Sequence, residues 1–309
     1  MFGEPPLPLG LIRRALDEEW SLAVEAVEYL AVGYGSFHWR SSGPDGWFVT
    51  ADRALPDTVV TQAYRLARQL RDDGLEFVRA PLPHRGDDVV WESDGWWLSV
   101  WPWVEGRTSP GTEHASAADL RATLGCVRKL HDHAAAAPVA ELVEHWSIPQ
   151  RSELVGFLED WPSPSGPYAD EVGSLLLGNE EAVYGLMDRY DGLTASITAR
   201  DVPHVITHGE PHAKNVVHTQ KGPMLIDWDT VRWAPRERDL WSFPDRRSWS
   251  DGYGADVEID DDIIETYRLQ WSLVEIADFA TSLAAAATRT PDLEVAMREL
   301  NKYLRAAES

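Results

Sequence analysis

The densest cluster of residues able to do chemistry lies between positions 205 and 229, where two apolar runs each lead into polar side chains. The first run delivers Glu210 and then Asn215, and the second delivers Asp227 and Asp229. Carboxylates and a carboxamide at the ends of two adjacent strands would form an oxygen-rich cluster. Oxygen ligands suit Mg²⁺, which binds few carboxylates and completes its shell with water and phosphate oxygens. The pattern therefore predicts a Mg²⁺ site.

Two histidines in the same segment raise an alternative, because His208 and His212 have the i, i+4 spacing of a zinc-binding helix. Gly209 and Pro211 lie between them, and proline breaks a helix interior. A zinc hydrolase is therefore disfavoured. His208 is expected to brace the loop through backbone hydrogen bonds rather than to act as a base.

The elements that must position this cluster fall into two regions. Residues 24–104 have the pattern of short strands around one helix. The expected strands are 27–32, 37–40, 47–50, 89–92 and 97–101, and the expected helix opens at Pro56 and Asp57 and stops near Gly74. Beyond residue 106 the pattern becomes helical. The expected helices are 117–134, 152–158, 172–197, 263–287 and one from Pro291, interrupted by strand-like segments at 202–207 and 224–228.

Composition narrows the class of protein. Of 309 residues, 28 are basic and 51 acidic, which gives a formal net charge of −23. Nucleic-acid and anionic-membrane partners are disfavoured, because their phosphates would be repelled. No apolar run approaches the roughly 20 residues of a membrane span, and no secretory signal is visible. The single Cys126 excludes an internal disulfide framework, so a cytoplasmic location is expected.

The segment His208-Gly209-Glu210 with Asn215, followed by Ile226-Asp227-Trp228-Asp229, resembles the aminoglycoside phosphotransferase and choline kinase-like family. That family carries H-G-D-x-x-x-x-N and then I-D-[WF]-[DE]. The resemblance extends to a hinge-like segment at 98–106, to Leu130-His131 and to residues 234–240. It implies an α+β, protein-kinase-like fold. A small β-rich nucleotide-binding lobe would cover 1–104, with a hinge at about 101–106, and a mainly helical catalytic and acceptor-binding lobe would cover 105–309.

By that resemblance, Asn215 and Asp227 are expected to hold the metal, and Glu210 to orient and deprotonate an acceptor hydroxyl. The residues expected to support this loop are His208, His212 and Asp229. Downstream, Arg238 and Asp239 are interpreted as an ion-paired fold element rather than as substrate contacts.

Nucleotide-binding residues are expected from two segments of the N-terminal lobe. The short loop over the phosphates would be formed by Gly33, Gly35 and Ser36. Backbone groups near Trp101 and Trp103 would bind the nucleobase.

Three positions depart from the family pattern. Position 210 holds glutamate, one methylene longer than the family's aspartate. The family's third-strand lysine is replaced by Thr50, and residues 58–73 contain no glutamate to pair with it. The two losses belong together, since a buried glutamate without its lysine would be a costly unpaired charge. A substitute cation is then expected among His38, Arg40 and Arg65.

Residues 251–262 form an acidic stretch without a basic residue. A solvated loop is the default interpretation. In the resembling family, however, the segment before the penultimate helix borders the acceptor pocket. The candidate acceptor-binding residues here and on the following helix are Asp260, Asp261, Asp262, Trp271, Glu275 and Asp278.

Two functions are therefore weighed. The preferred one is a small-molecule O-phosphotransferase that uses ATP or GTP with Mg²⁺. Its acceptor would be the hydroxyl of an antibiotic-like (aminoglycoside-type) molecule or an amino alcohol, a cationic acceptor being one option. The alternative is a nucleotide-binding pseudokinase with a sensing or scaffolding role, in which the missing lysine and altered base mark lost chemistry. The presence of both Asn215 and Asp227 favours the enzyme.

Overall fold

The structure is a computed structural model that describes residues 7–32, 36–43, 46–53, 58–109, 111, 114–134, 139–162, 166–243 and 246–307. Four residues named above, Gly33, Gly35, Pro56 and Asp57, lie outside this part of the chain. The chain divides into two compact units. The first unit comprises Met1–Val143 and His204–Glu258, and the second comprises Glu144–Pro203 and Ile259–Ser309.

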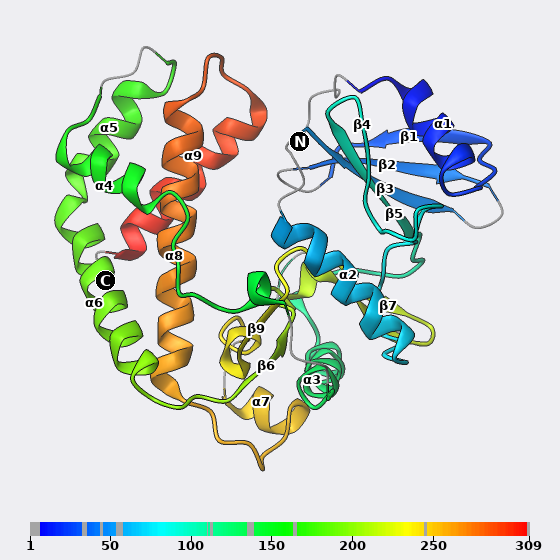
Figure 1. Ribbon diagram of the computed structural model, residues 1–309. Coiled ribbons are helices and arrows are strands. Elements are labelled where there is room, and N and C mark those ends of the chain that lie inside the picture. Colours follow the sequence, from blue (N-terminus) through cyan, green and yellow to red (C-terminus); the bar gives the residue numbers. More distant parts are fainter. Residues whose placement is uncertain are drawn as a thin grey trace. The chain divides into compact units, whose positions relative to one another are not determined.

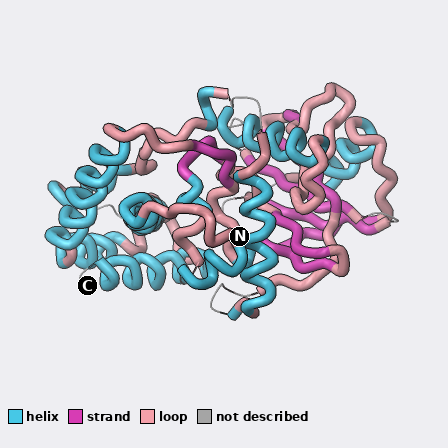
Figure 2. The backbone as a smooth tube through the Cα atoms, turned by 90° about the horizontal axis from the view of Figure 1, so that it is seen from below, coloured by secondary structure: helices cyan, strands magenta, loops and turns pink. Residues whose placement is uncertain are grey.

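One antiparallel sheet in the first unit has five strands in the order β1-β2-β3-β5-β4. The strands are labelled in Figure 1 and drawn in magenta in Figure 2. The strands are β1 (Ala26–Leu30), β2 (Phe37–Ser42), β3 (Trp47–Asp52), β4 (Trp91–Ser93) and β5 (Trp96–Pro102). The β4–β5 turn is tight because Asp94 and Gly95 both adopt positive φ. In this register Thr50 lies opposite His38 on β2 and Ser99 on β5.

A helix covers each face of this sheet. α1 (Leu9–Glu18), which the sequence analysis did not predict, buries Ile12 and Leu16 against Trp39 and Val49. The other face packs on α2 (Thr58–Asp72), the helix expected after residue 57. Strand alternation explains the arrangement, because successive side chains on β3 point to opposite faces.

The remainder of the first unit contains two two-stranded antiparallel sheets. β6 (His204–Thr207) pairs with β9 (Arg232–Pro235), and β7 (Val216–Thr219) pairs with β8 (Gly222–Leu225). The strands before Glu210 and before Asp227 are therefore not hydrogen-bonded neighbours, contrary to the prediction. β6 pairs with the strand that follows the Asp227–Asp229 segment, and β8 pairs with the strand that follows the Glu210 loop. The other elements are α3 (Ala117–His131), α7 (Arg246–Gly252), and the 3₁₀ turns η2 (Ala140–Leu142), η3 (Ala213–Asn215) and η4 (Arg236–Asp239).

The second unit is helical, and α8 (Asp261–Ala284) packs against its other helices. These are α4 (Arg151–Glu159), α5 (Ala169–Gly178), α6 (Glu180–Thr198) and α9 (Pro291–Ala307). The continuous helical region expected at 172–197 is two helices that meet at Asn179, whose side-chain amide donates to the Leu175 carbonyl. Among the described helices, none is long and apolar enough to cross a membrane.

Candidate active site

A buried carboxylate, that of Asp239, holds the backbone where the 208–215 loop begins. Asp239 is fully buried and accepts hydrogen bonds from the backbone N–H of His208 at 2.8 Å and of Gly209 at 2.6 Å. Its other contact is His131 Nε2 at 3.0 Å, and the opposite ring nitrogen of His131 contacts the Tyr253 hydroxyl. Asp239 thus ties α3, η4 and the loop together. The sequence analysis treated it only as a fold element and missed its contact with the loop.

We expect Asp239→Ala to lower the free energy of unfolding by about 3 kcal/mol or more, because it leaves buried polar groups without a partner. The matched control is Asp191→Ala, which removes a half-exposed ion pair with Arg151 and should cost about 1 kcal/mol or less. Chemical denaturation of both variants measures the difference. If the two variants lose equal free energy of unfolding, the buried contacts of Asp239 do not stabilise the fold more than a surface ion pair does.

Glu210 lies two residues into the loop, and both its backbone and its side chain have partners. Its N–H donates to Nδ1 of His208 at 3.3 Å, and its carboxylate lies 3.5 Å from Nε2 of His212. Burial alone would raise the pKa of Glu210, but the His212 hydrogen bond and the charges of His208, His212 and Arg238 lower it below its ordinary value. Glu210 is therefore an anion at neutral pH, with its carboxylate partly open to solvent.

Asn215 and Asp227 lie on segments that are hydrogen-bonded to one another. The Ile226 N–H donates to the Asn215 carbonyl at 3.0 Å, and Asn215 Nδ2 donates to the Glu210 carbonyl at 3.2 Å. The second bond uses Nδ2 and leaves Oδ1 as the acceptor atom of the Asn215 amide. Asp227 adopts a left-handed backbone with φ of 68°, a conformation that aspartate tolerates better than most residues. The structure thus brings Glu210, Asn215 and Asp227 into one loop system.

Two buried carboxylates of this system, those of Asp227 and Asp229, lie within the electrostatic influence of Glu210. Burial, followed by the charges of Asp229 and Glu210, raises the pKa of Asp227 to about 7. Burial and the Glu210 charge raise the pKa of Asp229 to about 6. Buried like charges favour a bound cation, and Asn215 Oδ1 and the Asp227 carboxylate supply oxygen ligands of the kind Mg²⁺ prefers. The described residues contain no group of three or more His, Cys, Asp or Glu side chains able to hold a metal ion. An amide oxygen and a carboxylate are a donor set that suits Mg²⁺ when water or phosphate oxygens supply the other ligands.

The position of the missing lysine is filled by neutral groups. Thr50 is buried, and its hydroxyl lies 3.3 Å from Nδ1 of His38. On α2, buried Tyr64 has its pKa raised by burial and then by the charges of Asp229 and Asp227. A hydroxyl thus stands where the family pattern predicts a lysine, and the α2 side chain that senses the Asp229 and Asp227 charges is a neutral phenol.

The three residues suggested by the sequence as substitutes for the lysine are either neutral or already paired with a carboxylate. Burial and the charge of Arg79 lower the pKa of His38 to about 4, so His38 is neutral at pH 7 and that suggestion is wrong. Arg40 pairs with Glu105 and stacks on Trp103, and Arg65 pairs with Asp88. Arg79, which the sequence analysis did not single out, is a buried cation that interacts electrostatically with Asp227.

The residues predicted to bind nucleotide lie on β2 and β5 or just beside them. Ser36 Oγ donates to the Asp52 carboxylate at 2.5 Å. The Trp101 indole is buried and donates to Ser99 Oγ at 2.9 Å, so only its backbone is available to a ligand. The Trp103 N–H donates to the Gly46 carbonyl, and its indole donates to Glu105. Gly33 and Gly35 lie outside the described residues.

The predicted acceptor-binding residues all belong to the second unit. Asp260 caps α8 by accepting from the N–H groups of Asp262 and Ile263, and it pairs with Arg200 at 2.7 Å. Trp271 donates its indole N–H to Tyr303 at 2.9 Å, and burial raises the pKa of Asp278. Asp261 and Glu275 also lie on α8. These contacts give Asp260 and Trp271 structural roles, and acceptor binding stays a prediction.

Comparison with known proteins identifies the family. The model of the phosphotransferase enzyme family matches residues 30–276. Protein StrN of Streptomyces griseus is 29% identical over 287 residues, which are 90% of this chain and 86% of that protein. Spectinomycin phosphotransferase APH(9)-Ia, in complex with ADP and spectinomycin, has a TM-score of 0.79 at 17% identity and covers 99% of both chains. Choline kinase LicA from Streptococcus pneumoniae has a TM-score of 0.61 at 14% identity, over 96% of this chain and 99% of that one.

The chain belongs to the phosphotransferase enzyme family. It is a phosphotransferase, a kinase with an alcohol group as acceptor. The predicted family and the protein-kinase-like α+β fold, a β-rich lobe followed by a mainly helical one, are confirmed.

Proposed function

We propose that this protein transfers the terminal phosphate of a nucleoside triphosphate to a hydroxyl of an antibiotic-like, aminoglycoside-type or amino-alcohol acceptor. The observation that carries this proposal is the loop system that unites Glu210, Asn215 and Asp227. Each of these side chains has the chemistry that phosphoryl transfer to a hydroxyl needs. A pseudokinase would have less need of all three.

In the proposed reaction the Glu210 carboxylate accepts a hydrogen bond from the acceptor hydroxyl and takes its proton as the oxygen attacks. The new O–P bond forms in line with the breaking bond to the leaving nucleoside diphosphate. Contact with His212 and a backbone set by Pro211 aim the longer glutamate side chain. Positioning and electrostatic stabilisation supply most of the catalysis.

Asn215 and Asp227 would hold Mg²⁺, which when bound neutralises charge on the phosphate oxygens. His208, His212 and Asp229 would keep these ligands in place.

The nucleotide, ATP or GTP, would bind under a loop containing Gly33, Gly35 and Ser36, with its base against the backbone of residues 101–104. The division into a nucleotide-binding lobe at 1–104 and a catalytic lobe at 105–309, and a cytoplasmic location, belong to the same proposal.

Acceptor class is supported by relatives and by charge. Spectinomycin phosphotransferase, amicoumacin kinase and choline kinase are among the similar structures. A net charge of −23 favours a cationic acceptor over an anionic one. Asp261, Asp262, Glu275 and Asp278 are the acceptor-contact candidates that we retain. We exclude nucleic acid and membrane as partners on the same charge argument.

Surface arginines are not expected to replace the missing lysine. Arg40→Ala combined with Arg65→Ala removes two exposed ion pairs and the stacking of Arg40 on the Trp103 ring. Because the nucleobase is expected to contact the backbone there and not the indole, we expect the KM for nucleotide to change by less than about twofold. Steady-state kinetics at a fixed acceptor concentration measure this value. A tenfold rise in the KM for nucleotide, equivalent to about 1.4 kcal/mol, would show that one or both arginines contact the phosphates.

The function is tested by a nucleotide-consumption screen with purified protein. The panel contains spectinomycin, kanamycin, choline, ethanolamine and aminopropanol, each with ATP and with GTP. Acceptor-dependent release of nucleoside diphosphate with at least one member supports the proposal. The proposal is contradicted if none of these acceptors raises the rate of nucleoside diphosphate release above the rate without acceptor, with ATP or with GTP.

A further inference from the structure

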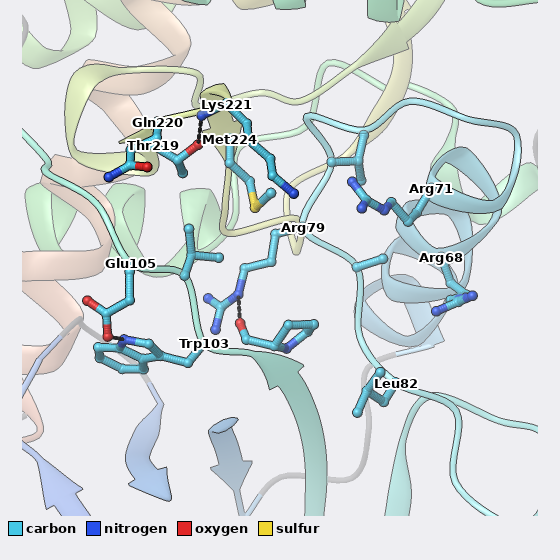
Figure 3. A pocket seen from close by; sticks show the side chains of 14 residues that line it. Arg68, Arg71, Arg79, Leu82, Trp103, Glu105, Thr219, Gln220, Lys221 and Met224 are labelled. Atoms are coloured by element: carbon cyan, nitrogen blue, oxygen red, sulfur yellow. Dashed lines mark hydrogen bonds between the residues drawn. The ribbon is translucent and has the colours of Figure 1, made fainter. Parts of the chain in front are cut away.

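A pocket of about 570 Å³ lies in the first unit, lined by segments 78–82 and 102–105 and by the β7–β8 turn (Figure 3). Its volume falls within the range of about 300–1,000 Å³ that is usual for small-molecule sites. Glu210, Asn215 and Asp227 are absent from its lining, so the candidate base and metal ligands lie outside it. We call it the hinge pocket.

Basic side chains from separate segments converge on the hinge pocket. Arg68 and Arg71 come from α2, Arg79 comes from the loop after α2, and Lys221 comes from the β7–β8 turn. Glu105 is the acidic residue of the lining. This excess of positive charge is unusual in a chain whose net charge is −23. In Figure 3 the Arg71 and Lys221 side chains extend toward the middle of the pocket from opposite walls.

Arg79 is the deepest of these cations. It exposes only 9% of its surface, and its Nε donates to the Pro102 carbonyl at 2.8 Å. Its guanidinium lies 4.8 Å from the centre of the Phe48 ring, which fixes its orientation. Within the described part of the chain, no residue accepts a hydrogen bond from its Nη atoms. These Nη atoms are not among the buried unpartnered atoms of the described residues, so they are open to an acceptor that enters from solvent. A charge-assisted hydrogen bond from a guanidinium to an anion is stronger than a neutral one.

The other basic residues of the lining differ in whether their side chains already have a hydrogen-bond or ion-pair partner. Arg68 is already paired with Asp72, and Arg71 donates to the Glu76 carbonyl. The Lys221 ammonium makes no hydrogen bond or ion pair with a described residue. Arg79 and Lys221 therefore have the most donors available to a ligand, with Arg71 beside them in the lining.

The rest of the lining is apolar. Val78, Leu82, Trp103 and Met224 contribute hydrocarbon or aromatic surface to the same pocket. Small-molecule sites commonly combine such surface with a few convergent polar groups that fix orientation. A ligand that satisfies both parts has one anionic group and an apolar or aromatic body.

We propose that the hinge pocket binds a small anionic molecule with an apolar or aromatic body. Its phosphate, sulfonate or carboxylate group is held by Arg79 and Lys221 with Arg71, and its body lies on Trp103 and Met224. This site adjoins the nucleotide site of the proposed function, with which it shares segment 102–104, and its remaining lining comes from Glu105 and from residues 68–82 and 219–224. Its test is a binding measurement that does not depend on turnover.

The methionine methyl groups provide the readout. The chain has four methionines, of which Met224 lines the hinge pocket while Met187 and Met297 lie in the core of the second unit. Protein labelled with ¹³C at the methionine methyls is titrated with phenyl phosphate in the presence of saturating AMP-PNP, which occupies the nucleotide site. We expect a saturable shift of the Met224 signal with a Kd of about 1 mM or below, while Met187 and Met297 stay unchanged.

Variants and probes then separate the contributions of charge and of apolar surface. Lys221→Gln combined with Arg71→Gln should weaken binding about tenfold or more, whereas the control Lys302→Gln, on α9, should leave it unchanged. Inorganic phosphate and benzyl alcohol should each bind more weakly than phenyl phosphate. The proposal is overturned if Met224 does not shift, if the double variant binds as tightly as the parent, or if either partial probe matches phenyl phosphate.

Discussion

Glu210→Gln should lower kcat by roughly 10²–10⁴-fold, the usual contribution of a positioned general base. Glutamine keeps the length of the side chain but cannot take the proton of the acceptor hydroxyl. The KM for nucleotide should stay within about threefold, because this role concerns the acceptor oxygen. Steady-state kinetics at saturating acceptor measure both values. The matched control is Glu92→Gln, an exposed glutamate on β4 of the same unit, which should leave both unchanged.

Glu210→Asp, which restores the family residue, should also be slower than the parent. The shorter side chain withdraws the carboxylate from His212, now 3.5 Å away, and a displacement of about 1 Å can cost about 100-fold in rate. If Glu210→Asp instead created activity in a parent that is inactive across the acceptor panel, the pseudokinase alternative would be correct. If Glu210→Gln kept full turnover, another group would be the base.

Asp227→Asn should lower turnover by about 10²–10³-fold or more, the range for losing one preorganised electrostatic group. The fold should survive, because Asp227 is buried beside the like charges of Asp229 and Glu210 and asparagine removes that repulsion. We therefore expect a melting temperature, measured without metal, no lower than that of the parent. Asp229→Asn is the control: it removes a neighbouring buried carboxylate that supports the site without holding the metal, so its loss of turnover should be smaller.

The same variant tests the metal assignment through binding. In the parent, Mg²⁺ should tighten nucleotide binding measured by calorimetry, and Asp227→Asn should remove that dependence. Equal nucleotide affinity with and without Mg²⁺ in the parent would remove Asn215 and Asp227 from the role of metal ligands. A melting temperature that falls sharply in Asp227→Asn would show that the carboxylate has a structural role instead.

The sequence was sufficient to predict the family, the fold class and the reaction class, because residue types at fixed spacing carry them. The segment from His208 to Asp229 combines a loop geometry that glycine permits with oxygen ligands that phosphate chemistry needs. Local strand and helix positions in the β-rich lobe followed from alternation and turn residues. The pairing of β6 with β9 could not be predicted, because the local sequence of a strand does not show with which distant strand it pairs.

Side-chain contacts between residues far apart in the chain could not be predicted from the sequence. Asp239 binds the backbone of residues 208 and 209 and the imidazole of His131, contacts between segments far apart in the chain. Arg79 was missed for the same reason: its position behind Phe48 and Pro102 depends on how the loop after α2 returns to the sheet. The low pKa of His38 arises from burial, which spacing alone does not reveal.

Direct detection of the phosphorylated product tests the central claim most directly. Purified protein is incubated with Mg²⁺, a nucleoside triphosphate and the acceptor that stimulates consumption most, and the mixture is followed by ³¹P NMR. The proposed function predicts a phosphate monoester signal coupled to protons on the hydroxyl-bearing carbon of the acceptor, formed by the parent and lost in Glu210→Gln. Inorganic phosphate as the sole product, or a monoester that Glu210→Gln forms equally fast, would contradict it.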